Sequence, residues 1–248
     1  MNISKISFVI PVYNEQMRIL KTLEELIIFF NKFEYEYEII FVNDGSTDDT
    51  SEIISKYIKE KSLNNYKLLN FTINRGKGAA VKFGMLNTSP NSNLFFFMDA
   101  DLSTPLQEIN NFINYYQETE TDIIIGSRSL TDSRVLKRQQ FYREWMGKTF
   151  NKLVKLIIFT KFVDTQCGFK LFTKKSKEKI FNLLRIARFS FDVEIVYLAK
   201  IFEFSIIDKP VIWINDERSR VNIFSDSIQM LIDIFKIRWY RITGKYLC

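Results

Sequence analysis

Short apolar runs alternate with segments of helical periodicity along the first hundred residues, and this alternation constrains the fold more than any other feature of the sequence. Runs of five to seven residues rich in Ile, Val and Phe are typical of buried strands, whereas apolar residues spaced three or four apart are typical of helices. The predicted strands are residues 6–12, 38–42, 66–71 and 94–98, and the predicted helices between them are residues 20–30, 47–61 and 76–86. This alternation predicts an α/β fold, with a mostly parallel sheet covered by helices on both faces.

A polar cluster follows each of the four predicted strands, at residues 13–15, 43–46, 74–77 and 99–101. The carboxyl ends of parallel strands meet at one edge of a sheet, which is where such folds bind ligands. Each cluster alone also fits a simpler role. Ser46 or Thr47 could cap a helix that begins near Asp48, and Arg75 and Lys77 could be ordinary solvated charges. Because the four clusters are expected at one edge, a binding site is favoured.

Asp99 and Asp101 directly follow the apolar run 94–98. Alternate residues of an extended segment point to the same side, so both carboxylates can face one ligand if the chain stays extended. The sequence contains no histidine and only two cysteines, so a metal here would be held by oxygen, which favours Mg²⁺ or Mn²⁺. The alternative is that the two aspartates only end the strand and cap the next turn.

Composition is consistent with one compact unit followed by a C-terminal extension, since 46% of the 248 residues are hydrophobic and no Gly- or Ser-rich linker divides them. The net charge of +6 is compatible with phosphate-bearing ligands, an anionic membrane surface or nucleic acid. Neither a signal peptide nor a membrane-spanning helix is expected. Cys167 and Cys248 make no disulfide framework, so a reducing compartment fits best.

Three motifs resemble the donor-site motifs of the family 2 glycosyltransferases, which have a GT-A, Rossmann-like fold. They are VIPVYNE at residues 9–15, VNDGSTD at 42–48 and DAD at 99–101. Four further segments are similar to the polyprenyl-phosphate branch of that family: GSR at residues 126–128, DTQCGFKLF at 164–172, FDVE at 191–194 and IRWYRITG at 237–244. The resemblance therefore covers nearly the whole chain.

The resemblance implies inverting, metal-dependent transfer of glucose from UDP-glucose to a polyprenyl (dolichyl-type) phosphate, giving a β-linked lipid-phosphate sugar. It implies a catalytic domain over residues 1–215, followed by an acceptor loop and a basic amphipathic extension over residues 216–248. The donor-binding residues carried over from the family are Pro11, Tyr13, Glu15, Asp44, Arg75, Lys77, Asp99 and Ala100. Asp99 and Asp101 would hold the Mg²⁺ or Mn²⁺ ion.

On the acceptor side, a phosphate monoester has a second pKa of about 6 and is largely ionised near neutral pH, so little general-base help is needed. Arg128, Arg143 and Arg220 match acceptor-phosphate positions, and Arg143 could instead be an exposed helical arginine. Asp101, Asp164 and Arg128 are the predicted catalytic residues. Asp164 would orient the acceptor or accept a proton, or would begin a turn that shapes the site.

Three other residues are ambiguous. Cys167 is expected to be a small packed thiol and not a nucleophile, because no histidine exists to activate it. Asp192 and Glu194 would share one side of the chain if that segment is extended. They would then stabilise the acceptor loop or neighbouring arginines, or form a purely structural ion pair.

Two stretches, residues 134–145 and 236–245, interleave basic and aromatic residues. Such stretches suit an anionic membrane surface, or they pack their aromatic rings into the core and leave the arginines in water. We expect a peripheral protein at the cytoplasmic face of a membrane. Two features depart from the family pattern. No N-terminal anchor of the kind usual in eukaryotic members is expected, because the first motif already begins at Val9. Arg218-Ser219-Arg220 replaces a Gly-Ser-Lys segment, which keeps a charge but loses the glycine's flexibility.

Two other functions remain open, and a third is disfavoured. The same donor site could transfer mannose, an N-acetylhexosamine or another sugar. A catalytically silent sugar-nucleotide-binding or membrane-scaffolding protein is a second alternative, against which the intact Asp99 and Asp101 argue. A nucleic-acid partner is not expected, because the basic residues are interspersed with acidic ones and no nucleic-acid-binding motif is present.

Overall fold

A computed structural model describes residues 3–137, 164–214 and 223–247 of the chain. Its centre is a seven-stranded sheet in the order β3-β2-β1-β4-β7-β5-β8. The strands are β1 (Lys5–Val12), β2 (Glu36–Asn43), β3 (Tyr66–Asn70), β4 (Leu94–Met98), β5 (Ile123–Ser127), β7 (Phe169–Thr173) and β8 (Ile206–Pro210). All neighbouring strands are parallel except β7, which runs antiparallel to β4 and β5. A separate pair of short parallel strands consists of β6 (Arg134–Lys137) and β9 (Ile212–Ile214).

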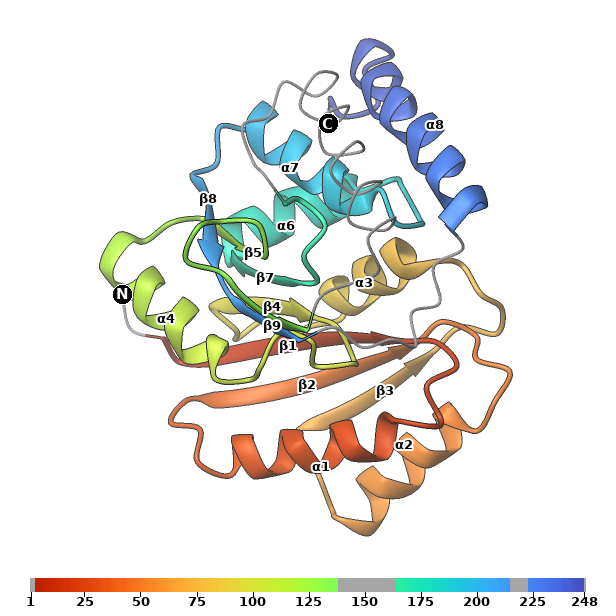
Figure 1. Ribbon diagram of the computed structural model, residues 1–248, viewed down its shortest axis with the longest axis vertical. Coiled ribbons are helices and arrows are strands. Elements are labelled where there is room, and N and C mark those ends of the chain that lie inside the picture. Colours follow the sequence, from red (N-terminus) through yellow and green to blue (C-terminus); the bar gives the residue numbers. More distant parts are fainter. Residues whose placement is uncertain (1–2, 138–163, 215–222, 248) are drawn as a thin grey trace.

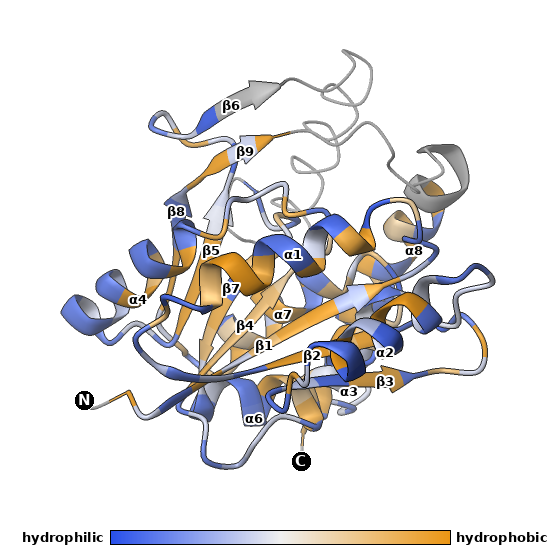
Figure 2. Cartoon of the chain, turned by 90° about the horizontal axis from the view of Figure 1, so that it is seen from below, coloured by the Kyte–Doolittle hydropathy of each residue, from blue (hydrophilic) through white to orange (hydrophobic). Residues whose placement is uncertain are grey.

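Helices cover both faces of the sheet, as predicted. Core residues of α1 (Ile19–Phe30), α2 (Thr50–Glu60) and α4 (Glu108–Thr119) belong to one apolar cluster. Those of α3 (Lys77–Leu86), α6 (Lys174–Leu183), α7 (Phe191–Ile201) and α8 (Ile223–Ile242) belong to another. Figure 1 shows α1 and α2 on one side of β1–β3 and α3 on the other. The strands are mostly apolar and the helices carry apolar and polar sides (Figure 2), which is the pattern expected when helices cover a buried sheet.

All four predicted strands and all three predicted helices are present, with their ends shifted by at most three residues. One predicted boundary was wrong: α2 begins at Thr50 and its cap residue is Asp49. The hydroxyl of Ser46 instead accepts a hydrogen bond from the backbone N–H of Asn14, at 2.9 Å. The polar residues before α2 therefore join the loop after β1 to the loop after β2.

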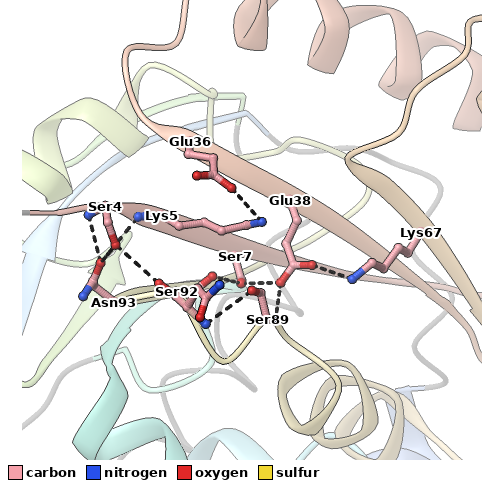
Figure 3. Close-up of polar contacts among 10 residues, drawn as sticks. Ser4, Lys5, Ser7, Glu36, Glu38, Lys67, Ser89, Ser92 and Asn93 are labelled. Carbon is pink, nitrogen blue, oxygen red and sulfur yellow. Dashed lines mark hydrogen bonds and ion pairs between the residues drawn. The ribbon is translucent and has the colours of Figure 1, made fainter.

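A buried carboxylate, Glu38, joins three strands at the amino-terminal edge of the sheet (Figure 3). It accepts hydrogen bonds from the hydroxyl of Ser7 (2.7 Å), the ammonium of Lys67 (2.8 Å) and the backbone N–H of Ser89 (2.5 Å). These donors lie on β1, on β3 and in the segment before β4. The edge opposite the predicted site is thus held together by its own polar network.

Within the described parts of the chain, none of the helices combines the length and the apolar character needed to span a membrane.

Candidate active site

The loops that follow β1 and β2 are hydrogen-bonded to each other at the carboxyl edge of the sheet. The backbone N–H of Asp44 donates to the carbonyl of Val12 (2.9 Å), and that of Thr47 donates to Oδ1 of Asn14 (2.8 Å). Asn14 has a φ of +53°, a left-handed conformation that asparagine tolerates better than most residues. The first two polar clusters therefore lie side by side at this edge, as predicted.

Three predicted donor-binding residues lie on or beside the first of these loops. Pro11 and Tyr13 are half-buried, and Glu15 is buried and ion-paired with Arg18, whose Nη2 lies 2.5 Å from Oε1. Ala100, in the fourth cluster, is also buried, and its carbonyl accepts a 2.8 Å hydrogen bond from the hydroxyl of Thr22. The helix after β1 thus anchors the loop after β4.

Asp44 holds the loop that follows β3. Its carboxylate accepts hydrogen bonds from the backbone N–H groups of Arg75 (2.7 Å) and Gly76 (2.9 Å) and from the side chain of Asn74 (3.0 Å). Burial raises the pKa of Asp44, and the hydrogen bonds from Arg75 and Gly76 oppose that rise. Arg75 contributes its backbone to this contact, while its guanidinium lies over the ring of Phe71 at 4.6 Å. Asp44 therefore shapes the predicted donor pocket through the backbone.

Lys77, at the start of α3, connects the third cluster to the fourth through an ion pair with Asp99 at 2.6 Å. Asp99 and Asp101 were expected to face one ligand if the chain stayed extended after β4, but the chain is not extended there. A turn forms in which the N–H of Leu102 bonds to the carbonyl of Asp99 at 3.3 Å. Burial and then the charge of Asp99 raise the pKa of Asp101, so the two carboxylates still interact. Asp101 also accepts a 2.9 Å hydrogen bond from the N–H of Ser103, so it does cap this turn.

Gly168, in the DTQCGFKLF segment, lies against the carboxylate of Asp99. A Cβ atom at Gly168 would lie only 1.9 Å from Oδ2 of Asp99. The carbonyl of Gly168 also accepts a hydrogen bond from the N–H of Asp99 at 3.0 Å. This close approach follows from the antiparallel pairing of β7 with β4, and it explains why a glycine occupies this position.

Arg128 and Asp164 form a two-pronged ion pair beyond the end of β5. Nε and Nη2 of Arg128 lie 2.7 and 2.8 Å from the two carboxylate oxygens, and the backbone N–H of Arg128 adds a third contact at 3.0 Å. The ring of Trp213 lies 5.4 Å from the guanidinium carbon. Burial acts to raise the pKa of Asp164, but the charge and hydrogen bonds of Arg128 outweigh burial and lower it. A carboxylate with a lowered pKa is a weak base, which favours the positioning role over proton transfer.

Cys167 is fully buried, and burial raises the pKa of its thiol to about 12. A thiol with such a pKa is almost entirely protonated near neutral pH, which agrees with the predicted packing role.

Sequence reasoning missed Lys170, a fully buried lysine on β7. Its ammonium lies 2.5 Å from Oδ1 of Asp192 and 2.6 Å from the carbonyl of Cys167. The only signal was a lysine within the apolar run 169–172. Asp192 and Glu194 would share one side only on an extended segment, and this condition is not met, because both residues lie in the first turn of α7.

Two predicted acceptor-phosphate residues, Arg143 and Arg220, lie outside the described residues, as do most of the basic stretch 134–145 and the boundary at residue 215. Within the described ranges, no three acidic or cysteine side chains group as a complete metal site. Asp99 and Asp101 are therefore the two carboxylates of the predicted metal site, and Asp99 is ion-paired with Lys77.

The sequence matches the family model described as Glycosyl transferase family 2 over residues 7–181. The chain belongs to this family. Dolichyl-phosphate beta-glucosyltransferase of Dictyostelium discoideum is 36% identical over 96% of this chain and 75% of its own length. The enzymes of that name from Saccharomyces cerevisiae and Homo sapiens are 34% and 30% identical, over 97% and 98% of this chain and 76% and 77% of their own lengths. The predicted resemblance and the expected class of enzyme, a glycosyltransferase, are confirmed.

Solved structures confirm the GT-A fold class of this family member. Glucosyl-3-phosphoglycerate synthase from Mycobacterium tuberculosis, in complex with UDP, gives a TM-score of 0.67 at 16% identity, over 94% of this chain and 80% of that one. TarS 1-349 from S. aureus, in complex with UDP-GlcNAc, gives a TM-score of 0.59 at 18% identity, over 94% and 66% of the two chains. The synthase is also known with Mn²⁺, UDP and glucosyl-3-phosphoglycerate.

Proposed function

We propose that the chain transfers glucose from UDP-glucose to a polyprenyl (dolichyl-type) phosphate with inversion, giving a β-linked lipid-phosphate sugar. The observation that carries this proposal is the similarity to dolichyl-phosphate beta-glucosyltransferases of three organisms along 96% or more of the chain. The geometry supports the proposal, because contacts join the loops after β1, β2, β3 and β4 at one edge of the sheet. Asp164 also holds the guanidinium of Arg128 in a fixed orientation.

On the donor side, we assign the nucleotide to the surface formed by the loops after β1, β2 and β3, which Asp44 holds together. Asp99 and Asp101 would hold Mg²⁺ or Mn²⁺, and their chemistry fits such an ion. Both offer oxygen ligands. Burial and then the charge of Asp99 raise the pKa of Asp101, and a bound cation would offset both effects. When bound, the ion neutralises negative charge on the departing UDP. Lys77 places a second cation beside Asp99.

On the acceptor side, Arg128 would bind the lipid phosphate and Asp164 would act by fixing the plane of the guanidinium. Arginine suits this task because its guanidinium carries five N–H donors, so that it can bond to Asp164 through Nε and Nη2 and still offer donors to phosphate oxygens. The phosphate oxygen that attacks the sugar is already largely ionised near neutral pH, so the low basicity of Asp164 is no obstacle. Arg143 and Arg220 are proposed as additional ligands of this phosphate.

A membrane surface is the proposed location of the acceptor, and α8 is the proposed contact. Five apolar side chains of α8, each 46–75% exposed, recur every three or four residues and form one stripe: Ile228, Ile232, Phe235, Trp239 and Ile242. The opposite side of α8 buries Ile234 and Ile237 completely against the protein. Helical geometry places Lys236 and Arg238 on the two flanks of the stripe. An apolar stripe between basic residues fits an anionic interface. We therefore assign residues 216–248 to an interfacial extension at the cytoplasmic face.

The reaction is tested by transfer of radiolabelled glucose from UDP-glucose into a solvent-extractable lipid, with purified protein, polyprenyl phosphate and Mg²⁺ or Mn²⁺. We expect labelled lipid that disappears with EDTA. Asp101→Asn should lower turnover at least about 100-fold, because it removes a charge from the proposed metal site, while the circular dichroism spectrum stays that of the wild type. Donors carrying mannose or N-acetylglucosamine, tested in parallel, should give little product. Full activity of Asp101→Asn would contradict the site assignment, and product only from another donor would contradict the choice of glucose.

A further inference from the structure

Glu194 is completely buried, yet none of the steps above uses it. Its carboxylate accepts hydrogen bonds from the backbone N–H groups of Arg185 (3.0 Å) and Ile186 (2.7 Å), in the loop between α6 and α7. It also accepts a 2.5 Å hydrogen bond from the hydroxyl of Tyr246, near the C-terminus. A buried carboxylate is costly unless it is well hydrogen-bonded, so these three donors explain how Glu194 is tolerated there.

The loop that Glu194 holds lies directly against the donor loop. The carbonyl of Ala187 accepts a hydrogen bond from the N–H of Ala79 in α3, at 3.0 Å. A Cβ atom at Gly76 would lie 2.5 Å from the same carbonyl, and one at Gly78 would lie 2.6 Å from the carbonyl of Ile186. No side chain therefore separates the two backbones. A shift of residues 185–187 would be transmitted to Gly76, whose N–H is held by Asp44, and to the neighbouring Lys77.

The C-terminal segment after α8 is held to the other side of the same carboxylate. Tyr246 is completely buried, and its ring packs edge-on against those of Tyr197 and Tyr240. The guanidinium of Arg185 reinforces the connection by donating to the carbonyl of Lys245 at 3.0 Å. The residues that complete this network, from Arg185 to Tyr246, lie beyond residue 181, where the match to the family model ends.

We propose that Glu194 and Tyr246 are positioning residues for donor binding: the C-terminal segment, through Glu194 and the α6–α7 loop, sets the position of the Gly76–Ala79 backbone. This inference rests on the proposed UDP-sugar site and adds to it a part of the chain that lies outside the nucleotide surface. Because α8 leads directly into this segment, the helix proposed to contact the membrane and the donor loop are parts of one hydrogen-bonded assembly.

The test compares Tyr246→Phe with the matched control Tyr197→Phe. Both remove one hydroxyl from the same aromatic cluster, but among the described residues only that of Tyr246 contacts Glu194. The dissociation constant of UDP is measured by calorimetry with Mn²⁺, together with the KM for UDP-glucose, the KM for polyprenyl phosphate and kcat. We expect Tyr246→Phe to weaken UDP binding and raise the donor KM about fivefold, with kcat at saturating donor and the acceptor KM within about twofold of the wild type. Tyr197→Phe should change none of them.

Arg185→Ala provides a second variant at an exposed position, in case Tyr246→Phe fails to fold. It removes the contact with Lys245 and leaves the backbone donors to Glu194 in place. Like Tyr246→Phe, it should therefore raise the dissociation constant of UDP. A lowered melting temperature with UDP binding equal to that of the wild type, in both variants, would show a purely structural role and overturn the inference alone. Absence of UDP binding by the wild-type protein would overturn the proposed function and this inference together.

Discussion

At the residue scale, the pairing of Arg128 with Asp164 decides what each residue can do. A carboxylate that is 2% exposed and bonded to both prongs of a guanidinium holds that group in one plane. The same pairing lowers the pKa of Asp164 and makes it a poor proton acceptor. The proposed role of Arg128 in binding the acceptor phosphate would therefore depend on how Asp164 orients its guanidinium.

Arg128→Lys tests that dependence, because lysine keeps the charge but cannot make the two-pronged contact. We expect the KM for polyprenyl phosphate to rise about tenfold, which corresponds to about 1.4 kcal/mol, and UDP affinity to stay unchanged. Steady-state kinetics with the acceptor varied, combined with UDP calorimetry, provides the measurement. A selective loss of UDP affinity would instead place Arg128 on the donor side.

At the element scale, α8 carries two apolar sides, one buried and one exposed. One side packs Ile234 and Ile237 against the protein, while the other leaves Phe235 and Trp239 about 60% exposed. A stripe that exposes large side chains at nearly every helical turn is more than the scattered apolar residues of an ordinary surface.

Ile228→Glu tests the proposed membrane contact, with Ile28→Glu on α1 as the matched control, since the two isoleucines are 62% and 67% exposed. Removing one isoleucine from the interface and adding a negative charge should weaken binding to anionic vesicles about tenfold or more, whereas the control should bind like the wild type. Vesicle flotation measures the bound fraction. Equal losses in both variants would argue against α8 as the contact.

At the scale of the whole molecule, the two edges of the sheet use buried carboxylates differently. At the carboxyl edge, burial raises the pKa values of Asp44 and Asp101 beside the proposed ligand site. At the amino-terminal edge, burial acts to raise the pKa of Glu38, but the hydrogen bonds from Lys67, Ser89 and Ser7 outweigh it and lower that pKa. At Asp101 the proposed cation would offset this cost of burial, whereas the hydrogen-bonded network of Glu38 stabilises the fold by itself.

A pKa lowered by folding has a definite consequence for stability. Glu38 should stabilise the fold fully above its ordinary pKa of 4.5, and that contribution should be lost as the pH falls through the lower folded pKa. Glu38→Gln should therefore lower the melting temperature near pH 7, by about 4–8 °C for a loss of about 2 kcal/mol. The difference from the wild type should shrink below pH 4.5.

Thermal unfolding at several pH values measures this difference. Glu36→Gln is the control, because Glu36 is 69% exposed although it too is ion-paired, with Lys5 at 3.0 Å (Figure 3). Such a surface pair contributes little to stability. A pH-independent effect of Glu38→Gln would show that shape, and not charge, accounts for the role of Glu38.

Much of the candidate site could be predicted because its parts follow local patterns. The polar clusters at residues 13–15, 43–46, 74–77 and 99–101 lie at strand ends, and strand ends are visible in the sequence. The turn at Asp99 was predicted only as an alternative to an extended segment, because the left-handed conformation of Leu102, with a φ of +50°, is unusual for a leucine and leaves no signal in the sequence. Lys170 was missed because its partner, Asp192, lies 22 residues away on another element.

The sequence by itself determined the strands and helices of the first hundred residues, the order of the polar loops that follow them and the family, because apolar periodicity and short motifs are properties of neighbouring residues. Only the tertiary structure decided which charges meet. The antiparallel strand β7 lies between β4 and β5 and brings Gly168 against Asp99. The contact between Tyr246 and Glu194 joins residues 52 positions apart. Such pairings depend on the order of the strands and on how helices pack across the sheet, and no local pattern specifies either.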